Sequence, residues 1–223
     1  MLPLARRLPE LIRFANDDRR LRKIYEKYKD FTMITSDTYV ENLRLARRIA
    51  HLPGSIVECG TWRGGMIAGM ADVLGSDRRY YLFDSFQGLP PATEIDGVAA
   101  LEWQSDKTSP SYYDNCTASK EEARIAMSAS AATDYQIIGG WFDDTLQKKS
   151  LPEPIALLRL DADWYASTKC ILENLATSIA SGGLIIVDDY YVWEGCTKAV
   201  NEVAALRKWQ IRQSRGGICF III

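Results

Sequence analysis

Short apolar runs alternate with helical stretches from Ser55 to the end of the chain, and this alternation limits the possible folds most strongly. A parallel sheet covered by helices on both faces produces this pattern, because each strand needs a crossover that returns the chain to the same end of the sheet. We expect such strands at Ser55 to Cys59, Arg79 to Phe83, Tyr135 to Ile138, Ile155 to Leu160 and Leu184 to Val187. The last four are apolar enough to be buried on both faces. The pattern therefore predicts an α/β, Rossmann-like fold with a mostly parallel sheet.

The end of the chain predicts an antiparallel addition to this sheet. A helix over Glu194 to Leu206 is followed by apolar runs at Trp209 to Gln213 and Ile218 to Ile223, which a turn with two glycines joins. Two such runs close together are typical of a hairpin. The run CFIII could also mark a membrane or aggregation segment, but a membrane span needs about 20 apolar residues. We therefore expect a C-terminal hairpin, which brings the sheet to seven strands.

Residues 1–52 and 84–115 interrupt the alternation. Helical periodicity in Leu8 to Tyr28 and in Thr38 to His51 predicts an N-terminal helical cap over residues 1–52, ahead of a core at 53–223. Residues 84–115 follow directly on a strand's carboxyl end, where ligands of open α/β sheets bind. We interpret this segment as a lid, with a plain surface insertion as the alternative. At 223 residues and 47% hydrophobic, the chain has the size of a single domain.

Charge and cysteine content limit the partners. Lys plus Arg number 27 and Asp plus Glu number 29, so the formal charge is −2. This balance argues against a nucleic-acid binder and favours a small-molecule partner. The five cysteines form no C-x-x-C pair and His51 is the single histidine, which disfavours structural zinc and indicates reduced thiols in the cytoplasm. The N-terminal segment mixes arginines into its apolar residues, so we expect neither a signal peptide nor membrane insertion.

A glycine-bearing turn follows the first expected strand in the segment SIVECGTWRGGMIAGM. Glu58 stands at the strand end, and Gly60, Gly64 and Gly65 allow a ligand to approach the backbone at the start of a helix with unpaired N–H groups. One strand later, Asp84 in YYLFDSFQGLP stands where an acid accepts hydrogen bonds from ribose hydroxyls. Each feature alone is common, and Asp84 could be only a helix cap. Together they predict a nucleoside site.

Four carboxylates follow two strands that we expect to be neighbours. Asp161 and Asp163 lie in LLRLDADWYAST, and Asp188 and Asp189 lie in LIIVDDYYVWEGC. Neighbouring parallel strands bring these acids together, and a bound cation relieves their repulsion most simply. Oxygen-only ligands select a hard metal, and magnesium fits best, ahead of calcium or manganese. Helix capping is the alternative, although capping needs one acid per helix.

Five segments in a fixed order resemble the macrocin O-methyltransferase (TylF-like) family from about Met33 to Val203: VECGTWRGG, FDSFQGLP, GGWFDDTL, LRLDADWYAST and VDDYYVWEGCTKAV. The glycine turn is also similar to the first motif of class I methyltransferases. The resemblance implies a class I fold that uses S-adenosylmethionine and Mg²⁺ to methylate a sugar hydroxyl of an antibiotic-type glycoside, in a homodimer or larger homo-oligomer. The candidate cofactor-binding residues are Glu58, Gly60, Thr61, Gly64, Gly65, Asp84, Ser85 and Asp161.

The same resemblance gives roles to the four carboxylates. It makes Asp163 the general base and places the metal on Asp161, Asp188 and Asp189. The metal is expected to bind two neighbouring substrate oxygens and to lower the pKa of the hydroxyl, because a carboxylate alone is a weak base for an alcohol. We also consider Tyr190, Tyr191 and Trp193 as walls for the acceptor, with core packing as the alternative.

Other functions fit the sequence less well. Ala162 and Ala166 stand where the family usually has glycine and glutamate, so contacts beside the acids differ from the family's. The main alternative is a catechol-type metal-dependent O-methyltransferase, which uses the same fold and acids on an aromatic diol. A regulatory domain without catalysis would show missing acids or a broken glycine turn, and a Rossmann oxidoreductase would show the spacing G-x-G-x-x-G. The sequence has none of these features.

Overall fold

The computed structural model describes residues 4–147 and 151–223, and within this part of the chain seven strands form one sheet. The order across the sheet is β3-β2-β1-β4-β5-β7-β6. The first five pair in parallel, whereas β7 is antiparallel to both β5 and β6. Their bounds are β1 Ser55–Cys59, β2 Arg79–Asp84, β3 Asp134–Gly139, β4 Ile155–Leu160, β5 Ile179–Val187, β6 Ile211–Gln213 and β7 Cys219–Ile222. The predicted α/β class, the seven strands and the C-terminal hairpin are confirmed.

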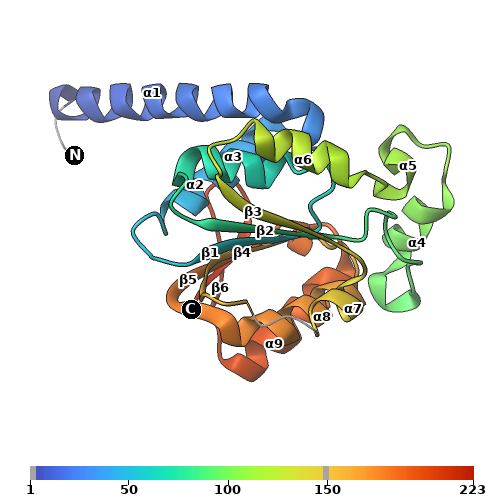
Figure 1. Cartoon of the computed structure of the whole chain (residues 1–223). Coiled ribbons are helices and arrows are strands. Elements are labelled where there is room, and N and C mark those ends of the chain that lie inside the picture. The colour runs from blue at the N-terminus through green and yellow to red at the C-terminus, as the bar shows by residue number, and fades with distance from the viewer. Residues whose placement is uncertain (1–3, 148–150) are drawn as a thin grey trace.

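Helices cover both faces of the sheet (Figure 1). One face carries α1 Leu4–Tyr28, α2 Ser36–Arg47, α3 Gly65–Leu74 and α6 Lys120–Ser128. The opposite face carries α7 Phe142–Thr145, α8 Tyr165–Leu175 and α9 Glu194–Arg207. Single 3₁₀ turns connect some of these elements: η1 Lys29–Phe31, η4 Ala176–Ser178 and η5 Asp189–Tyr191. The N-terminal helices α1 and α2 thus belong to the layer that also contains α3.

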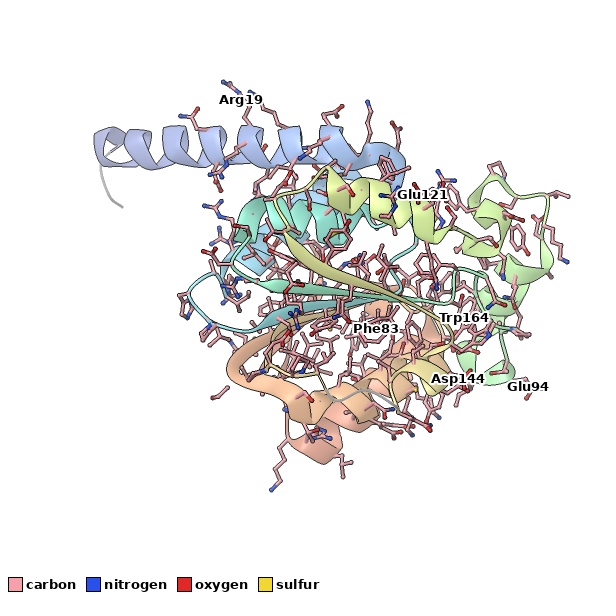
Figure 2. The ribbon with its side chains drawn as sticks, viewed as in Figure 1. Arg19, Phe83, Glu94, Glu121, Asp144 and Trp164 are labelled. Atoms are coloured by element: carbon pink, nitrogen blue, oxygen red, sulfur yellow. The ribbon has the colours of Figure 1, made fainter. Side chains whose placement is uncertain are left out.

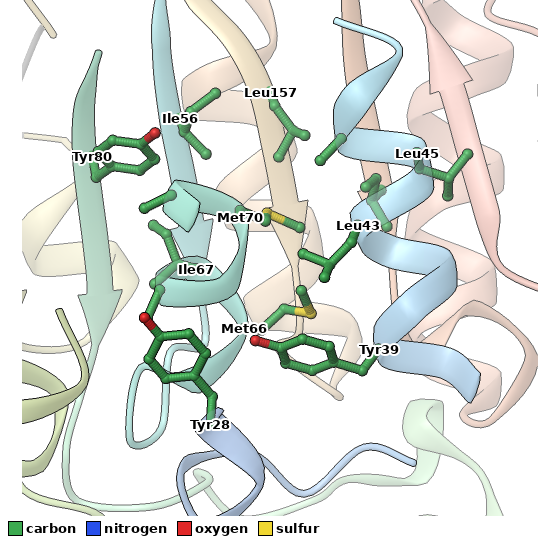
Figure 3. Packing of buried hydrophobic residues seen from close by; sticks show 14 of the residues in the cluster. Tyr28, Tyr39, Leu43, Leu45, Ile56, Met66, Ile67, Met70, Tyr80 and Leu157 are labelled. Atoms are coloured by element: carbon green, nitrogen blue, oxygen red, sulfur yellow. The ribbon is translucent and has the colours of Figure 1, made fainter. Parts of the chain in front are cut away.

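A hydrophobic core fills the space between each helical layer and the sheet. Figure 3 shows the core between the sheet and the layer of α2 and α3, in which Leu43 of α2 and Met70 of α3 face Ile56 and Leu157 of the central strands. Each of these four side chains is at most 1% exposed. Burial of this apolar surface is the main force that holds the helices on the sheet. The central strands β1 and β4 are therefore rigidly placed, and so are the residues that follow them.

The structure corrects one expectation about the strands. Tyr135 to Ile138, predicted to be buried on both faces, lies in β3, where the residues are half-buried or exposed. The reason is position, because β3 is the edge strand and pairs with β2 alone. The central strands β1, from Ser55 to Cys59, and β4, from Ile155 to Leu160, are buried along their whole length. An apolar run does not by itself distinguish an edge strand from a central one.

The segment after β2 lies at the end of the sheet where the parallel strands finish (Figure 1). It contains elements that the sequence did not predict: η2 Glu94–Asp96, α4 Val98–Ser105, η3 Pro110–Tyr112 and α5 Tyr113–Cys116. Residues 84–115, which we interpret as a lid, lie at these strand ends, and their action as a lid stays a prediction. In the described part of the chain, no helix is both long and apolar enough to cross a membrane.

Candidate active site

A cavity opens at the carboxyl ends of the central strands, beneath the segment that follows β2. Residues from both expected ligand regions line it. From the nucleoside side these are Glu58, Gly60, Thr61, Asp84 and Ser85, and from the carboxylate side Asp161, Asp163, Asp188 and Asp189. Topology explains the convergence, because β2, β1, β4 and β5 are consecutive neighbours in the sheet and end at the same edge.

Backbone hydrogen bonds extend the sheet by one residue past several strands and so fix the start of each ligand loop. Gly60 N donates to Phe83 O, Asp161 N to Cys59 O and Asp188 N to Leu160 O, each at 2.9 Å. Gly60 has φ +86°, and a Cβ at this position would lie 1.6 Å from the carbonyl oxygen of Asp161. A glycine is therefore required where the nucleoside loop approaches the carboxylate loop.

Gly64 and Gly65 serve packing in this structure and are not among the residues that line the cavity. Gly64 has φ +81°, and a Cβ there would lie 3.1 Å from Cα of Ala123 in α6. A Cβ on Gly65 would lie 2.5 Å from the carbonyl oxygen of Phe31. These glycines allow α3 to pack closely against its neighbours, while Gly60 and Thr61 face the cavity.

Asp84 is held by the backbone around it. Its two carboxylate oxygens accept hydrogen bonds from the N–H groups of Trp62 and Phe86, each at 2.7 Å. Burial raises the pKa of Asp84, and these backbone donors oppose the rise. Each carboxylate oxygen can accept a further hydrogen bond, so the acid is preoriented to receive hydroxyl groups.

Glu58 forms a buried ion pair with Arg159 of β4. The Nη1 group of Arg159 donates to Oε1 of Glu58 at 2.9 Å, and both side chains are 1% exposed. Burial raises the pKa of Glu58 to about 8, although Arg159 lowers it. The register of the sheet places these two residues directly opposite each other on β1 and β4. This end of the cavity is thus built on a fully buried pair.

Carboxylate oxygens of Asp161, Asp163 and Asp189 lie within 4.8 Å of one another, an arrangement that could hold a metal ion. Asp163 has φ +54°, and this left-handed turn directs its N–H to Oδ2 of Asp189 at 3.1 Å. Burial raises the pKa of Asp161 to about 6 and that of Asp163 to about 8. Burial and the neighbouring carboxylates also raise the pKa of Asp189. Burial and mutual repulsion therefore disfavour the ionised forms of these acids unless positive charge is added to the cluster.

Asp188 lies beside this cluster but faces Arg159. Its Oδ1 is 2.8 Å from Nη2 of Arg159 and accepts a hydrogen bond from Nδ2 of Asn42 at 3.5 Å. Asp188 is thus not in the group of three acids that converges in this structure, although it lines the same cavity. Its role as a metal ligand stays a prediction.

Helix capping does not explain the four acids. The N-cap residues of α8 and α9 are Trp164 and Trp193, and neither makes a side-chain cap hydrogen bond to a described residue. The N–H of Tyr165 at the start of α8 is bound instead by Oδ1 of Asp96, at 2.7 Å. None of the four acids therefore serves as the N-cap residue of α8 or α9.

Aromatic side chains form the wall of the cavity next to the acids. Trp193 donates a hydrogen bond from Nε1 to Oδ1 of Asp163 at 2.9 Å. The rings of Trp164 and Trp193 are 5.2 Å apart, and each is 6.1 Å from Trp103 in α4. Figure 2 shows Trp164 beside the lid segment. Trp193, but neither Tyr190 nor Tyr191, lines the cavity, so one of the three aromatic candidates has the expected position.

Arg159 and Trp103 are site residues that the sequence reasoning missed. Arg159 had a usable signal, because a charged residue in the middle of the buried run IALLRL needs a buried partner. Trp103 had none, since the helix that carries it was not predicted. The segment GGWFDDTL was expected near the cleft, and its residues Gly140, Trp141 and Phe142 do line the cavity.

Comparisons with known proteins give a consistent result. The family model for macrocin-O-methyltransferase (TylF) matches residues 13–213. The demethyldecarbamoylnovobiocin O-methyltransferase of Streptomyces niveus is 37% identical over 163 residues, which are 70% of this chain and 60% of the relative. The 8-demethyl-8-(2,3-dimethoxy-alpha-L-rhamnosyl)-tetracenomycin-C 4'-O-methyltransferase of Streptomyces olivaceus is 34% identical over 159 residues, 68% of this chain and 58% of the relative. The chain spans about 60% of the length of these curated relatives.

Solved structures show the same fold. The structure of the O-methyltransferase NovP superposes with a TM-score of 0.72 at 27% identity and covers 86% of this chain and 81% of NovP. The calicheamicin methyltransferase CalS11 superposes with a TM-score of 0.62 at 19% identity, over 93% of this chain and 91% of CalS11, and supports the fold alone. The predicted class I methyltransferase fold is confirmed.

Proposed function

This chain belongs to the macrocin O-methyltransferase (TylF) family, and from that premise we propose that it methylates a hydroxyl oxygen on the sugar moiety of a natural product, with S-adenosylmethionine as donor and Mg²⁺ as metal. One observation carries the proposal. A single cavity joins a nucleoside-type end, with Glu58 and Asp84, to a cluster of carboxylates with Asp161 and Asp189. A methyl donor and a hydroxyl acceptor that occupy these two ends would meet in the middle of the cavity.

The cofactor would bind at the ends of β1 and β2. Asp84 is preoriented by two backbone N–H groups and would accept hydrogen bonds from the ribose hydroxyls. Gly60 and Thr61 would follow the rest of the cofactor along the turn, and Ser85 lines the cavity beside Asp84. Glu58, held by Arg159, would lie on the side of the sulfonium and amino groups of the cofactor.

The carboxylate cluster fits a hard divalent cation. Its donor atoms are all oxygens, they converge within 4.8 Å, and their negative charge is undercompensated, as the raised pKa values of Asp161, Asp163 and Asp189 indicate. Magnesium at Asp161 and Asp189 would orient two neighbouring hydroxyls of the acceptor and lower the pKa of the one that reacts. The third ligand is Asp188 in our sequence prediction, whereas the structure offers Asp163.

Asp163 is proposed to take the proton of the reacting hydroxyl. Trp193 holds its carboxylate in place through a hydrogen bond of 2.9 Å. With S-adenosylmethionine bound, the hydroxyl oxygen would form a bond to the methyl carbon, and the electron pair of the broken carbon–sulfur bond would stay on sulfur as S-adenosylhomocysteine. The hydroxyl proton would pass to Asp163. The residues of the chain contribute position and charge, and no covalent bond to the protein is needed.

The acceptor is proposed to be a glycoside with vicinal oxygens. The lid segment and Trp193 close one side of the cavity, so the face of a sugar ring could pack on the aromatic wall. We further propose that the protein acts in the cytoplasm, where its five free cysteines would stay reduced, and as a homodimer or larger homo-oligomer, which light scattering would test.

Binding and turnover measured in parallel test the proposal. Calorimetry with S-adenosylhomocysteine should give a micromolar Kd for a class I methyltransferase site, and glycosides incubated with S-adenosylmethionine should gain a methyl group with Mg²⁺ but not with EDTA. Phenolic diols belong in the same screen, because their exclusive methylation would favour the catechol-type alternative. Failure to bind S-adenosylhomocysteine under any condition would refute the proposal.

Metal binding is tested on three variants. Asp189→Asn should weaken Mn²⁺ binding, followed by electron paramagnetic resonance, by about tenfold or more. Asp163→Asn and Asp188→Asn then decide the third ligand, because the true ligand gives the larger loss. Asp144→Asn is the matched control, since Asp144 is an exposed carboxylate in the first turn of α7 (Figure 2).

A further inference from the structure

Arg159 stands between the two ends of the cavity. Its Nη1 group donates to Oε1 of Glu58 at 2.9 Å and to Oδ2 of Asp161 at 2.8 Å. Glu58 belongs to the proposed cofactor side and Asp161 to the carboxylate cluster. One nitrogen atom of a side chain that is 1% exposed therefore joins both sites.

The other two nitrogens of Arg159 are also engaged. Nη2 lies 2.8 Å from Oδ1 of Asp188, and Nε donates to Oδ1 of Asn42 at 3.3 Å. Asn42 comes from α2 and is fully buried. A guanidinium is a rigid planar fork, so its contacts cannot shift independently. Movement of one carboxylate partner changes the position of the guanidinium for the others.

We propose that Arg159 is a positioning residue that couples the two sites, so that a divalent cation at the carboxylate cluster tightens cofactor binding. This inference rests on the proposed function. A cation bound by Asp161 takes over the charge compensation of that carboxylate, which leaves Nη1 of Arg159 to Glu58. Glu58 then has the undivided hydrogen bond that holds it in its cofactor-binding orientation. By linkage, the cofactor must tighten cation binding by the same factor.

A merely structural Arg159 would give a different result. If the guanidinium only compensated buried charge, its loss would weaken the protein and both ligands' binding, but would leave the effect of one ligand on the other unchanged. The ratio of the two cofactor dissociation constants, with and without metal, therefore isolates the coupling from general damage.

The test is calorimetry of S-adenosylhomocysteine with saturating Mg²⁺ and with EDTA. In the wild type, Mg²⁺ should lower the Kd by about fivefold or more. In Arg159→Met the ratio should fall close to one. Arg159→Lys should also lose most of the coupling, because an ammonium group keeps the charge but cannot span three carboxylates. Arg79→Met is the matched control and should keep the wild-type ratio, since Arg79 is on β2 and pairs with Asp134 at the edge of the sheet.

Each outcome either supports or overturns the coupling through Arg159. A wild type that binds S-adenosylhomocysteine with the same Kd in both conditions, or an Arg159→Met protein with the wild-type ratio, overturns the coupling but leaves the proposed function intact. A wild type that does not bind S-adenosylhomocysteine refutes the proposed function itself. If Arg159→Met does not fold, Arg159→Lys and Asn42→Ala take its place. Asn42→Ala frees the Nε side of the guanidinium and should reduce the ratio, and an unchanged ratio in both variants overturns the inference.

Discussion

Trp193 connects the aromatic wall of the cavity to the acid that we propose as the base. Burial raises the pKa of Asp163 to about 8, and the hydrogen bond from Trp193 opposes this rise because it favours the ionised carboxylate. Trp193→Phe removes the donor but keeps an aromatic ring. We expect the pKa of Asp163 to rise, so the acidic limb of kcat/KM against pH should move to higher pH by about one unit at saturating Mg²⁺.

Trp164→Phe is the control for this substitution. Trp164 belongs to the same aromatic group, but its Nε1 donates to the carbonyl oxygen of Pro90 at 2.9 Å and not to a carboxylate. Its loss should leave the acidic limb in place. An unmoved limb in Trp193→Phe, or an equal movement in both variants, would show that the indole of Trp193 does not control the ionisation of Asp163.

At the residue scale, the sequence predicted which acids lie close together but not the direction in which each side chain points. Neighbouring parallel strands ensure that Asp161 and Asp188 are close, because the register pairs Arg159 with Ile186 and so continues to these two acids. Side chains alternate between the two faces of a strand, so Asp188, two residues after Ile186, lies on the same face as Arg159. The left-handed turn at Asp163 brings this residue back to Asp189, and no strand or helix pattern contains that turn. The sequence therefore predicted that these acids lie close together, but not how they are arranged.

At the element scale, the lid segment supplies the acceptor at the start of α8. Oδ1 of Asp96 in η2 accepts from Tyr165 N at 2.7 Å, and Oδ2 accepts from both N and Oγ1 of Thr93. Asp96 is 3% exposed. Asp96→Ala should lower the free energy of unfolding by about 1 to 2 kcal/mol, because it removes a helix cap and the anchor of the lid. Thermal denaturation measures the loss, and the KM for the acceptor should rise.

Asp106→Ala provides the comparison for Asp96. Asp106 also accepts hydrogen bonds from a threonine two residues later, Thr108, but it is exposed and its contacts stay within the loop. We expect the free energy of unfolding to change by no more than about 0.5 kcal/mol, and the KM for the acceptor to stay the same. Equal destabilisation by both substitutions would mean that the anchor to α8 contributes nothing beyond a local turn.

Elements with a clear apolar pattern were predicted well, and elements whose formation depends on tertiary contacts were not. The predicted ranges Ser55 to Cys59 and Ile155 to Leu160 coincide with β1 and β4, because both are apolar runs between clear turns. The helix α4 from Val98 to Ser105 was missed, since it lies within a segment rich in turn residues and buries Ala100 alone. Its position depends on the packing of Trp103 against Trp164 and Trp193 in the cavity wall. No pattern in the sequence of the helix predicts this packing.

At the scale of the whole molecule, the fold brings many carboxylates together in one buried site. Six carboxylates line the cavity: Glu58, Asp84, Asp161, Asp163, Asp188 and Asp189. Arg159 pairs with three of them, Glu58, Asp161 and Asp188. Burying uncompensated charge costs free energy, so the sheet and its two cores must supply the difference. A site of this kind should make the stability of the protein depend on pH and on cations.

The direction of the pH dependence follows from the raised pKa values. A carboxyl whose pKa is higher in the folded than in the unfolded state contributes stability below the unfolded value, and that contribution is lost as pH rises through the folded value. The pKa of Glu58 rises from 4.5 to about 8, and that of Asp163 from 3.8 to about 8. In EDTA, the Tm should therefore fall as the pH is raised from about 5 to about 8.

Magnesium should reverse this loss, because it binds the ionised carboxylates of the folded protein and stabilises that state by mass action. The difference in Tm between Mg²⁺ and EDTA should therefore grow with pH across the same window, with ionic strength held constant to exclude general screening. Asp189→Asn should reduce the Mg²⁺ effect, whereas Asp144→Asn, on an exposed carboxylate of α7, should preserve it. A Tm in EDTA that stays level or rises between these pH values would show that water or other groups already compensate the buried acids, and the need for a cation at this site would lose its physical basis.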